Sequence, residues 1–361
     1  MNKKFSNYLT TLWQSLLFWT LAMLALGIIR FYGIADDEGI QIANGYEEVI
    51  TMPIILPFFA LLGVAMGFIY GTLEHLFDGV ISKRIAIGLQ NLIKIFVYFI
   101  IIIILLTLLI ELVRHMYDIP LNNQIGWWRR DRTFRAIVLY VFLSALVFSF
   151  IKISNEKFGK GVFLKMLLGK YKKPIEEFRI FMFLDLHSST TIAETLGHYK
   201  YSQLIQDCFY DLNELVPKYS AEIYQYVGDE AVLSWPYKKG LLNNQCVALF
   251  FSFQELLVSK EAFYQKKYGL VPKFKAGMHG GKLMVAEVGV VKKELAFHGD
   301  VINTSARIQA ECNNFGVPIL LSEQLIEDLD ISKDYTQKPL GSVLLKGKHK
   351  KVNIFTLIEV Q

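Results

Sequence analysis

Two acidic residues stand where a folded chain could present them to a cation. Asp185 ends an apolar stretch, Arg179–Leu186, that predicts a buried strand, and Asp229 follows Gly228 at the turn of a predicted hairpin, Glu222–Trp235. If these strands are neighbours, both carboxylates meet at one sheet edge. Hard oxygen ligands suit Mg²⁺ or Mn²⁺, with phosphate filling the other coordination positions. Two ions about 4 Å apart would stabilise an attacking and a leaving oxygen. Taken alone, Gly228-Asp229 is equally typical of an ordinary turn, and Asp185 is equally typical of a cap at the end of a strand.

The elements that position these acids alternate between helices and strands from residue 178 onward. We predict helices over Thr191–Val216, Leu241–Lys260 and Val301–Asn313, a strand pair over Phe274–Val288 turning at Gly280-Gly281, a strand over Val317–Ser322 and a closing hairpin over Val343–Leu357. This order indicates an α+β or α/β domain with a mixed sheet.

Five motifs in this region resemble those of class III nucleotidyl cyclases. They are FLDLHSST at 183–190, VGD at 227–229, AGMHGG at 276–281 followed by Val288-Gly289, GDVINTSAR at 299–307 and LKG at 345–347. Together they cover about 178–358 in the family's order. The resemblance implies a ferredoxin-like α+β core, the class III cyclase fold.

The resemblance also implies the roles of individual residues. Asp185, Asp229 and the backbone carbonyl of Leu186 would hold two Mg²⁺ or Mn²⁺ ions per site. The amides of the loop that contains Ser188, Ser189 and Thr190 would bind phosphate.

The helix motif supplies the remaining catalytic groups. Asn303 would orient the ribose and Arg307 would stabilise charge on the α-phosphoryl group; four residues apart on a helix, they share one face. Lys346, in preference to Lys348, would meet the terminal phosphates. The ribose 3′-hydroxyl would attack the α-phosphorus and pyrophosphate would leave. Family members build each site from two such domains, so this chain is expected to act as a homodimer with two equivalent sites.

The positions that select the base in the family depart from its usual pattern. They hold Gln225 and Ala296, where family members have Lys and Asp or Thr. Gln can donate and accept hydrogen bonds and so could read adenine, and the Glu of guanylate-specific members is missing. We therefore expect ATP as the nucleoside triphosphate. The alternatives are a cyclase for GTP or a pyrimidine nucleotide, a diguanylate cyclase, and a membrane receptor that binds nucleotide without catalysis.

Composition separates this region from the residues before it. The chain has 361 residues, 53% of them hydrophobic, and a mean hydropathy of +0.34. Charged residues number 22 in 1–155, about 14%, and 49 in the other 206, about 24%. Four apolar stretches, at 9–31, 52–74, 89–113 and 133–153, are long enough to cross a bilayer. The sequence thus predicts a four-helix transmembrane domain at 1–155, a basic amphipathic connector at 156–177 and a catalytic domain at 178–361.

Charge patterning predicts the orientation of the spans. Lys3, Lys4 and the lysines of the connector favour the inside, and the acidic loop at 36–48 suits the outside, although the arginines between 114 and 135 disagree. We expect a multi-pass protein of the cell (inner) membrane with its N-terminus and catalytic domain in the cytoplasm. The net charge of +5 is assigned to the membrane surface and not to nucleic acid.

Two further functions of the spans are disfavoured. His75 and His115 end successive antiparallel spans and would lie roughly 30 Å apart, too far to ligate one haem iron. Lys94 and Glu111 lie at span ends, where they are expected to reach the headgroups, so the bundle has no paired intramembrane charges of the kind a transporter uses.

Overall fold

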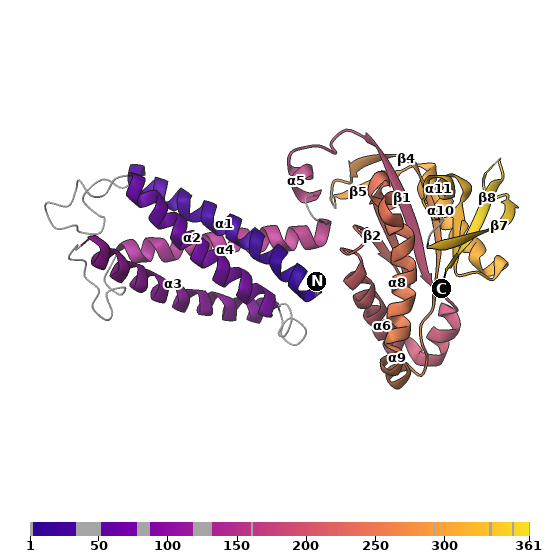
Figure 1. The fold of residues 1–361 in the computed structure, drawn as a ribbon, viewed down its shortest axis with the longest axis horizontal. Helices are drawn as coiled ribbons and strands as arrows, with labels where there is room; N and C mark the ends of the chain where they lie inside the picture. The colour runs from indigo at the N-terminus through magenta and orange to yellow at the C-terminus, as the bar shows by residue number, and fades with distance from the viewer. Residues whose placement is uncertain are drawn as a thin grey trace. The chain divides into compact units, whose positions relative to one another are not determined.

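The computed structural model describes residues 3–33, 52–77, 87–117, 132–159, 162–291, 293–331, 334–348 and 350–360. The chain divides into two compact units, Met1–Ser154 and Asn155–Gln361. The first is built from helices and the second from a mixed sheet with helices (Figure 1). Four long apolar helices followed by a mixed α/β domain confirm the predicted fold class.

Four long helices make up the first unit. They are α1 (Lys3–Gly33), α2 (Met52–Leu76), α3 (Ile87–Tyr117) and α4 (Arg132–Phe158). Each contains one of the four predicted apolar stretches. In α1, α2 and α4 the stretches Thr11–Ile29, Leu56–Leu76 and Arg135–Asn155 are long and apolar enough to cross a membrane, and α3 carries a shorter one, Phe96–Leu108. Large apolar side chains are exposed along all four helices, as lipid-facing surfaces would be.

Helices α1 and α2 approach each other closely along a row of glycines. Gly63, Gly67 and Gly71 recur every four residues and therefore share one face of α2. A Cβ atom at Gly63 would lie 2.6 Å from the Cα of Thr20, and one at Gly67 would lie 2.7 Å from the Cα of Leu16. The two backbones can pack at this distance only because α2 has no side chains there.

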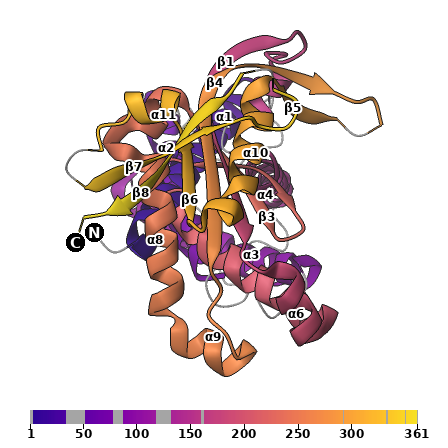
Figure 2. The same ribbon diagram turned by 90° about the vertical axis from the view of Figure 1, so that its right-hand side faces the viewer.

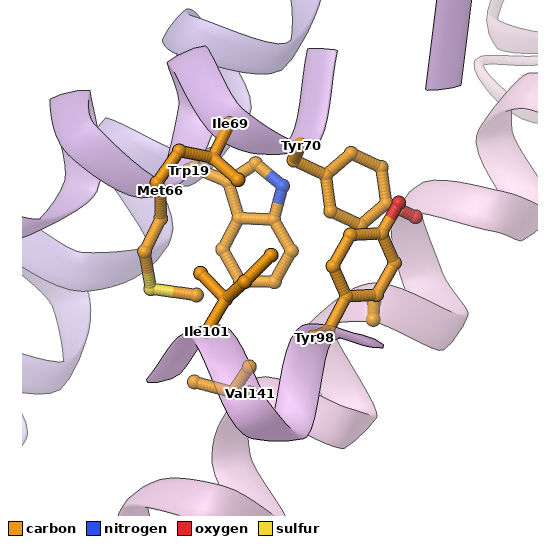
Figure 3. Close-up of a pocket in the computed structure, with 8 residues that line it drawn as sticks. Trp19, Met66, Ile69, Tyr70, Tyr98, Ile101 and Val141 are labelled. Carbon is orange, nitrogen blue, oxygen red and sulfur yellow. The ribbon is translucent and has the colours of Figure 1, made fainter. Parts of the chain in front are cut away.

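Aromatic side chains fill the core of the bundle. Trp19 and Tyr70 are buried, and Tyr70 stacks on Tyr98 with ring centroids 4.4 Å apart. Figure 3 shows these rings around a small cavity of about 20 Å³. It is completed by Met66, Ile69, Ile101, Val141 and Ala145.

An ionic cluster lies beside this core, contrary to our expectation for Lys94. The Lys94 ammonium group lies 2.8 Å from the carboxylate of Glu74, whose side chain is 3% exposed, and the Lys152 ammonium group lies 2.7 Å from the same carboxylate. Lys94 therefore turns inward to a carboxylate instead of reaching the headgroups, and the bundle does contain paired charges. The sequence did not predict this cluster because Glu74 and Lys152 are 20 and 58 residues from Lys94, and the three side chains lie on three different helices. The loops at 34–51, 78–86 and 118–131, whose charges bear on the predicted orientation, lie outside the described residues.

The second unit is built around one sheet. Its elements are α5 (Val162–Leu167), β1 (Ile175–Leu186), α6 (Ser189–Leu215), β2 (Glu222–Val227), β3 (Glu230–Pro236), α7 (Tyr237–Leu241), the 3₁₀ turn η4 (Leu242–Asn244), α8 (Gln245–Ser259), α9 (Glu261–Tyr268), β4 (Phe274–Val288), β5 (Glu294–His298), α10 (Asp300–Phe315), β6 (Ile319–Ser322), α11 (Glu323–Asp328), β7 (Tyr335–Val343) and β8 (Val352–Glu359). The strand order is β2-β3-β1-β4-β6-β8-β7, and β5 pairs with β4. Only β4 and β6 are parallel.

The central strand β1 is apolar from Ile180 to Leu184, where both of its faces are buried. Ile180, Met182 and Leu184 point into a core shared with α6 and α8, whereas Phe181 and Phe183 point into a second cluster that includes Val301 of α10. Figure 2 shows α10 beside the strands of this sheet. Side chains alternate along a strand, so Asp185 lies on the α10 face.

Three details differ from the sequence predictions. Residues 274–288 form one continuous strand, because Gly280 and Gly281 make room for neighbouring side chains and not for a turn: Cβ atoms there would lie 2.4 Å from Tyr237 and 2.8 Å from Val301. The closing hairpin consists of β7 and β8, and the LKG motif lies in the turn between them. Finally, α9, α11 and β5 were not predicted.

Another stretch long and apolar enough to cross a membrane, Tyr237–Ser259, contributes its α8 residues to the core of this unit.

Candidate active site

The two acids come together where β1 ends and β2 turns into β3. Asp185 pairs in register with Glu230, the first residue of β3, and Asp229 directly precedes it. Gly228 adopts a φ of +62°, a conformation that side chains other than Gly rarely take, so it makes the tight turn possible. Three carboxyl groups are thus gathered at one sheet edge.

Burial and neighbouring carboxyl groups raise the pKa values of Asp185 and Glu230. Burial raises the pKa of Asp185 above its ordinary range, Lys275 opposes the shift, and Asp229 adds to it. Burial together with Asp185 and Asp229 raises the pKa of Glu230 to about 7. Burial and the nearby Asp229 also raise the pKa of the Tyr201 phenol to about 12. Concentrated negative charge of this kind is relieved by a bound cation.

The chemistry of this edge fits a divalent cation. Oδ2 of Asp229 is buried and has no hydrogen-bond partner among the residues that the structure describes. Burying such an atom is costly unless another group compensates it. The described residues contain no group of three or more His, Cys, Asp or Glu side chains arranged to hold a metal. Two carboxylates would therefore need further oxygens. The backbone carbonyl of Leu186, whose side chain is buried, and phosphate are the candidates.

The predicted phosphate loop coincides with the N-terminus of a long helix. Ser188 lies in the left-handed region, with a φ of 56°, and α6 begins at Ser189. Thr190 belongs to the first turn, where backbone N–H groups have no acceptor within the helix. Because α6 follows β1 after two residues, these donors lie next to Asp185. A helix N-terminus in this position suits a phosphate group.

Asn303 and Arg307 lie on α10 but face away from that edge. The opposite face of the helix contacts the sheet: the Ser305 hydroxyl lies 3.5 Å from the His279 carbonyl oxygen of β4, and Gln309 Nε2 donates to Asp185 Oδ2 at 3.1 Å. Residues two apart on a helix point about 200° apart. Asn303 and Arg307 are each two residues from Ser305, so both point nearly opposite to the Ser305 side chain and away from the sheet. The structure does not bring them together with the acids of the same chain.

The closing turn approaches the Arg307 face of α10. A Cβ atom at Gly347 would lie 3.4 Å from the Arg307 guanidinium. Lys348 forms an ion pair with Asp300, the first residue of α10. Lys346 is exposed, and in the part of the chain that the structure describes it has no ion-pair partner. Of Lys346 and Lys348, the two candidates from the sequence, Lys346 is therefore the one that is available to an anion.

The two positions predicted to select the base flank one aromatic contact. Gln225 follows Tyr224 on β2, and Ala296 precedes Phe297 on β5. The rings of Tyr224 and Phe297 lie 4.8 Å apart between centroids. This contact brings β2 and β5 together although they are not neighbours in the sheet. Gln225 is exposed and Ala296 is half-buried.

Two residues beside Asp185 escaped the sequence analysis. Lys275 of β4 is the register partner of Asp185, and its ammonium lies 3.2 Å from Asp185 Oδ2. Gln309 contacts the same oxygen. The available signals were a lysine next to the start of a mostly buried strand and a glutamine four residues after Ser305. Neither signal indicates a partner until the strand register is known.

A mixed sheet with acids and a helix N-terminus at one edge indicates a class of domains that handle phosphorylated substrates with divalent cations. The model of the adenylate and guanylate cyclase catalytic domain matches residues 171–359. The chain therefore belongs to the class III adenylate and guanylate cyclase family, as its motifs predicted.

Individual relatives agree with this family. The chain is 32% identical over 221 residues to adenylate cyclase 2 of Rhizobium meliloti, and the match covers 61% of each protein. It is 20% identical over 183 residues to an adenylate cyclase of Anabaena cylindrica, covering 48% of this chain and 35% of that protein. Among solved structures, a bacterial light-regulated adenylyl cyclase matches with a TM-score of 0.51 at 16% identity, over 61% of this chain and 63% of that one. This last match supports the fold alone.

Proposed function

We propose that the chain is a membrane-anchored adenylate cyclase that converts ATP to 3′,5′-cyclic AMP and pyrophosphate as a homodimer. One observation carries the proposal. Asp185 and Asp229 lie at one sheet edge, whereas Asn303 and Arg307 lie on the face of α10 that turns away from it. One chain thus presents two complementary half-sites, and a two-fold dimer would join the acids of each chain to Asn303 and Arg307 of the other.

In such a dimer each half-site has its own task. Asp185, Asp229 and the Leu186 carbonyl would hold two Mg²⁺ or Mn²⁺ ions, which would supply charge stabilisation to the reacting oxygens. The backbone amides at Ser188, Ser189 and Thr190 would bind phosphate.

The other half-site would act on the reacting groups. Asn303 would orient the ribose so that its 3′-oxygen bonds to the α-phosphorus as the bond to pyrophosphate breaks. Arg307 would stabilise the charge that develops on the α-phosphoryl group, and Lys346 would bind the terminal phosphates. Catalysis would then depend on positioning and electrostatics, as phosphoryl transfer generally does.

ATP is favoured by Gln225, whose amide can both donate to and accept from adenine, and by the Rhizobium relative, which is described as an adenylate cyclase. We further propose that residues 1–155 anchor the protein in the cell membrane, that 156–177 connect the anchor, and that 178–361 are the cytoplasmic catalytic domain. The connector has a suitable surface, since Leu164, Leu167 and Leu168 are exposed beside lysines.

Product analysis of the full-length protein tests this function. We expect cyclic AMP from ATP and Mn²⁺, with far less product from GTP, CTP or UTP. D185A and R307A should each be inactive, and co-expression of the two chains should restore one intact site per mixed dimer.

Each part of the proposal can fail separately. Preferential turnover of another nucleotide would overturn the ATP assignment, and no cyclic product from any nucleotide would favour a binding domain. Mixed dimers that are isolated by two affinity tags and remain inactive would refute the shared site.

A further inference from the structure

One oxygen of the predicted metal ligand Asp185 is shared by two donors of the same chain. Lys275 Nζ lies 3.2 Å and Gln309 Nε2 lies 3.1 Å from Asp185 Oδ2. Lys275 also donates to Asn313 Oδ1 at 3.3 Å. Asp185 Oδ1 is thereby left as the oxygen available to a cation.

The backbone holds both donors in place. Lys275 stands directly opposite Asp185 in the β1–β4 ladder, and its side chain is only 12% exposed. Gln309 is buried and belongs to the turn of α10 that lies against Gly277 of β4. A Cβ atom at Gly277 would come within 2.1 Å of the backbone nitrogen of Gln309. Neither side chain can leave Asp185 without losing packing or another polar contact.

The two donors differ in charge. The sheet edge gathers the carboxyl groups of Asp185, Asp229 and Glu230, and Lys275 brings a positive charge into contact with Asp185. A fixed cation beside a metal site weakens the attraction of the site for a second cation, whereas a neutral amide orients a carboxylate without changing the charge.

We propose that Gln309 and Lys275 are positioning residues that hold Asp185 through Oδ2, and that the charge of Lys275 keeps the affinity of the free site for divalent cations low. A cation then binds well only together with a nucleoside triphosphate, whose phosphates offset the lysine. This inference rests on the proposed function, because it takes Asp185 as a metal ligand.

Mn²⁺ binding to the full-length protein without nucleotide tests the inference, and it is read from the electron paramagnetic resonance signal of free Mn²⁺. Removing the charge in K275M should tighten binding about tenfold or more. K275R retains the charge and should bind as the wild type does. Q309M retains the charge but loses the orienting amide and should bind more weakly. D185A should abolish the binding that these variants modulate.

The opposite signs expected for K275M and Q309M separate an electrostatic role from a merely structural one. Unchanged or weaker Mn²⁺ binding by folded K275M would overturn the proposal, and so would tighter binding by K275R. If K275M does not fold, K275Q, which keeps a hydrogen-bond donor without the charge, takes its place with the same expected tightening. Because no turnover is measured, a protein that binds Mn²⁺ as described but makes no cyclic nucleotide would refute the proposed function and leave this inference standing.

Discussion

Replacing Gly277 by alanine should disable the site without touching any predicted ligand. Gly277 is the fourth residue of β4 and lies where α10 packs on the strand, and its φ is not in the left-handed region. A methyl group there would meet the backbone of α10, with its Cβ 2.1 Å from the Gln309 nitrogen and 2.4 Å from the Gln309 Cα. Backbone atoms cannot swing aside as the end of a side chain can.

The size of the effect follows from this geometry. Ordinary contact begins at 3.4 Å, so α10 and β4 must separate by about 1.3 Å at this point. Overpacking of a well-packed core costs about 1–3 kcal/mol. The same movement displaces Asn303 and Arg307, and a misplacement of about 1 Å can reduce the rate about 100-fold. We therefore expect Gly277→Ala to lower stability moderately and activity severely.

Steady-state cyclase activity and thermal unfolding of the purified protein measure the two effects. Gly281→Ala is the matched control, since its Cβ would meet only a methyl group of Val301, at 2.8 Å, and we expect a milder loss of both activity and stability. A Gly277→Ala protein with the activity and unfolding temperature of the wild type would refute the close approach of α10 to β4.

Two further predictions concern other parts of the chain. Burial lowers the pKa of His279 to about 4 from an ordinary 6.5, and Lys348 adds to the shift. Below pH 6.5 the unfolded chain therefore binds a proton at this histidine that the folded chain does not bind. The contribution of the neutral imidazole to the free energy of unfolding is complete above pH 6.5 and falls by about 3 kcal/mol as the pH drops to 4. Hydrogen exchange of β4 amides at pH 7 and pH 5 should show a smaller fall in H279Q than in the wild type, and equal falls would contradict the assignment. In the bundle, Gly67→Ile should force α1 from α2 and lower the thermal stability of the detergent-solubilised protein, whereas Val64→Ile, at an exposed position on α2, should not.

Local patterns sufficed wherever structure depends on neighbouring residues. The four apolar helices, the β2–β3 turn at Gly228 and the helix that carries Asn303 and Arg307 were all predicted from short stretches. Gly280 and Gly281 were misread as a turn because a glycine signals equally a turn and a close approach. Only the tertiary neighbours Tyr237 and Val301 decide between the two.

Contacts between distant residues were beyond the sequence for a different reason. Lys94 was predicted to flank the third span and reach the headgroups, yet it pairs with Glu74 of another helix within the bundle. Lys275 and Asp185 are 90 residues apart and meet only through the register of β1 with β4. A pattern reports which face of an element a residue occupies, whereas the partner on that face depends on how the elements are paired.

The two faces of α10 bear on how a dimer would work. Through Gln309 the helix is tied to Asp185 of its own chain, and through Asn303 and Arg307 it would serve the site completed by the partner. A shift of α10 caused by a ligand at one site would therefore also move groups that act in the other. Under the proposed dimer, the two sites should not be energetically independent, and the first nucleotide should alter the affinity for the second. Binding of a non-cyclisable ATP analogue tests this coupling. If the analogue binds both sites of the wild-type dimer with a single affinity, and binds a D185A/R307A mixed dimer that retains one intact site with that same affinity, then α10 does not couple the two sites.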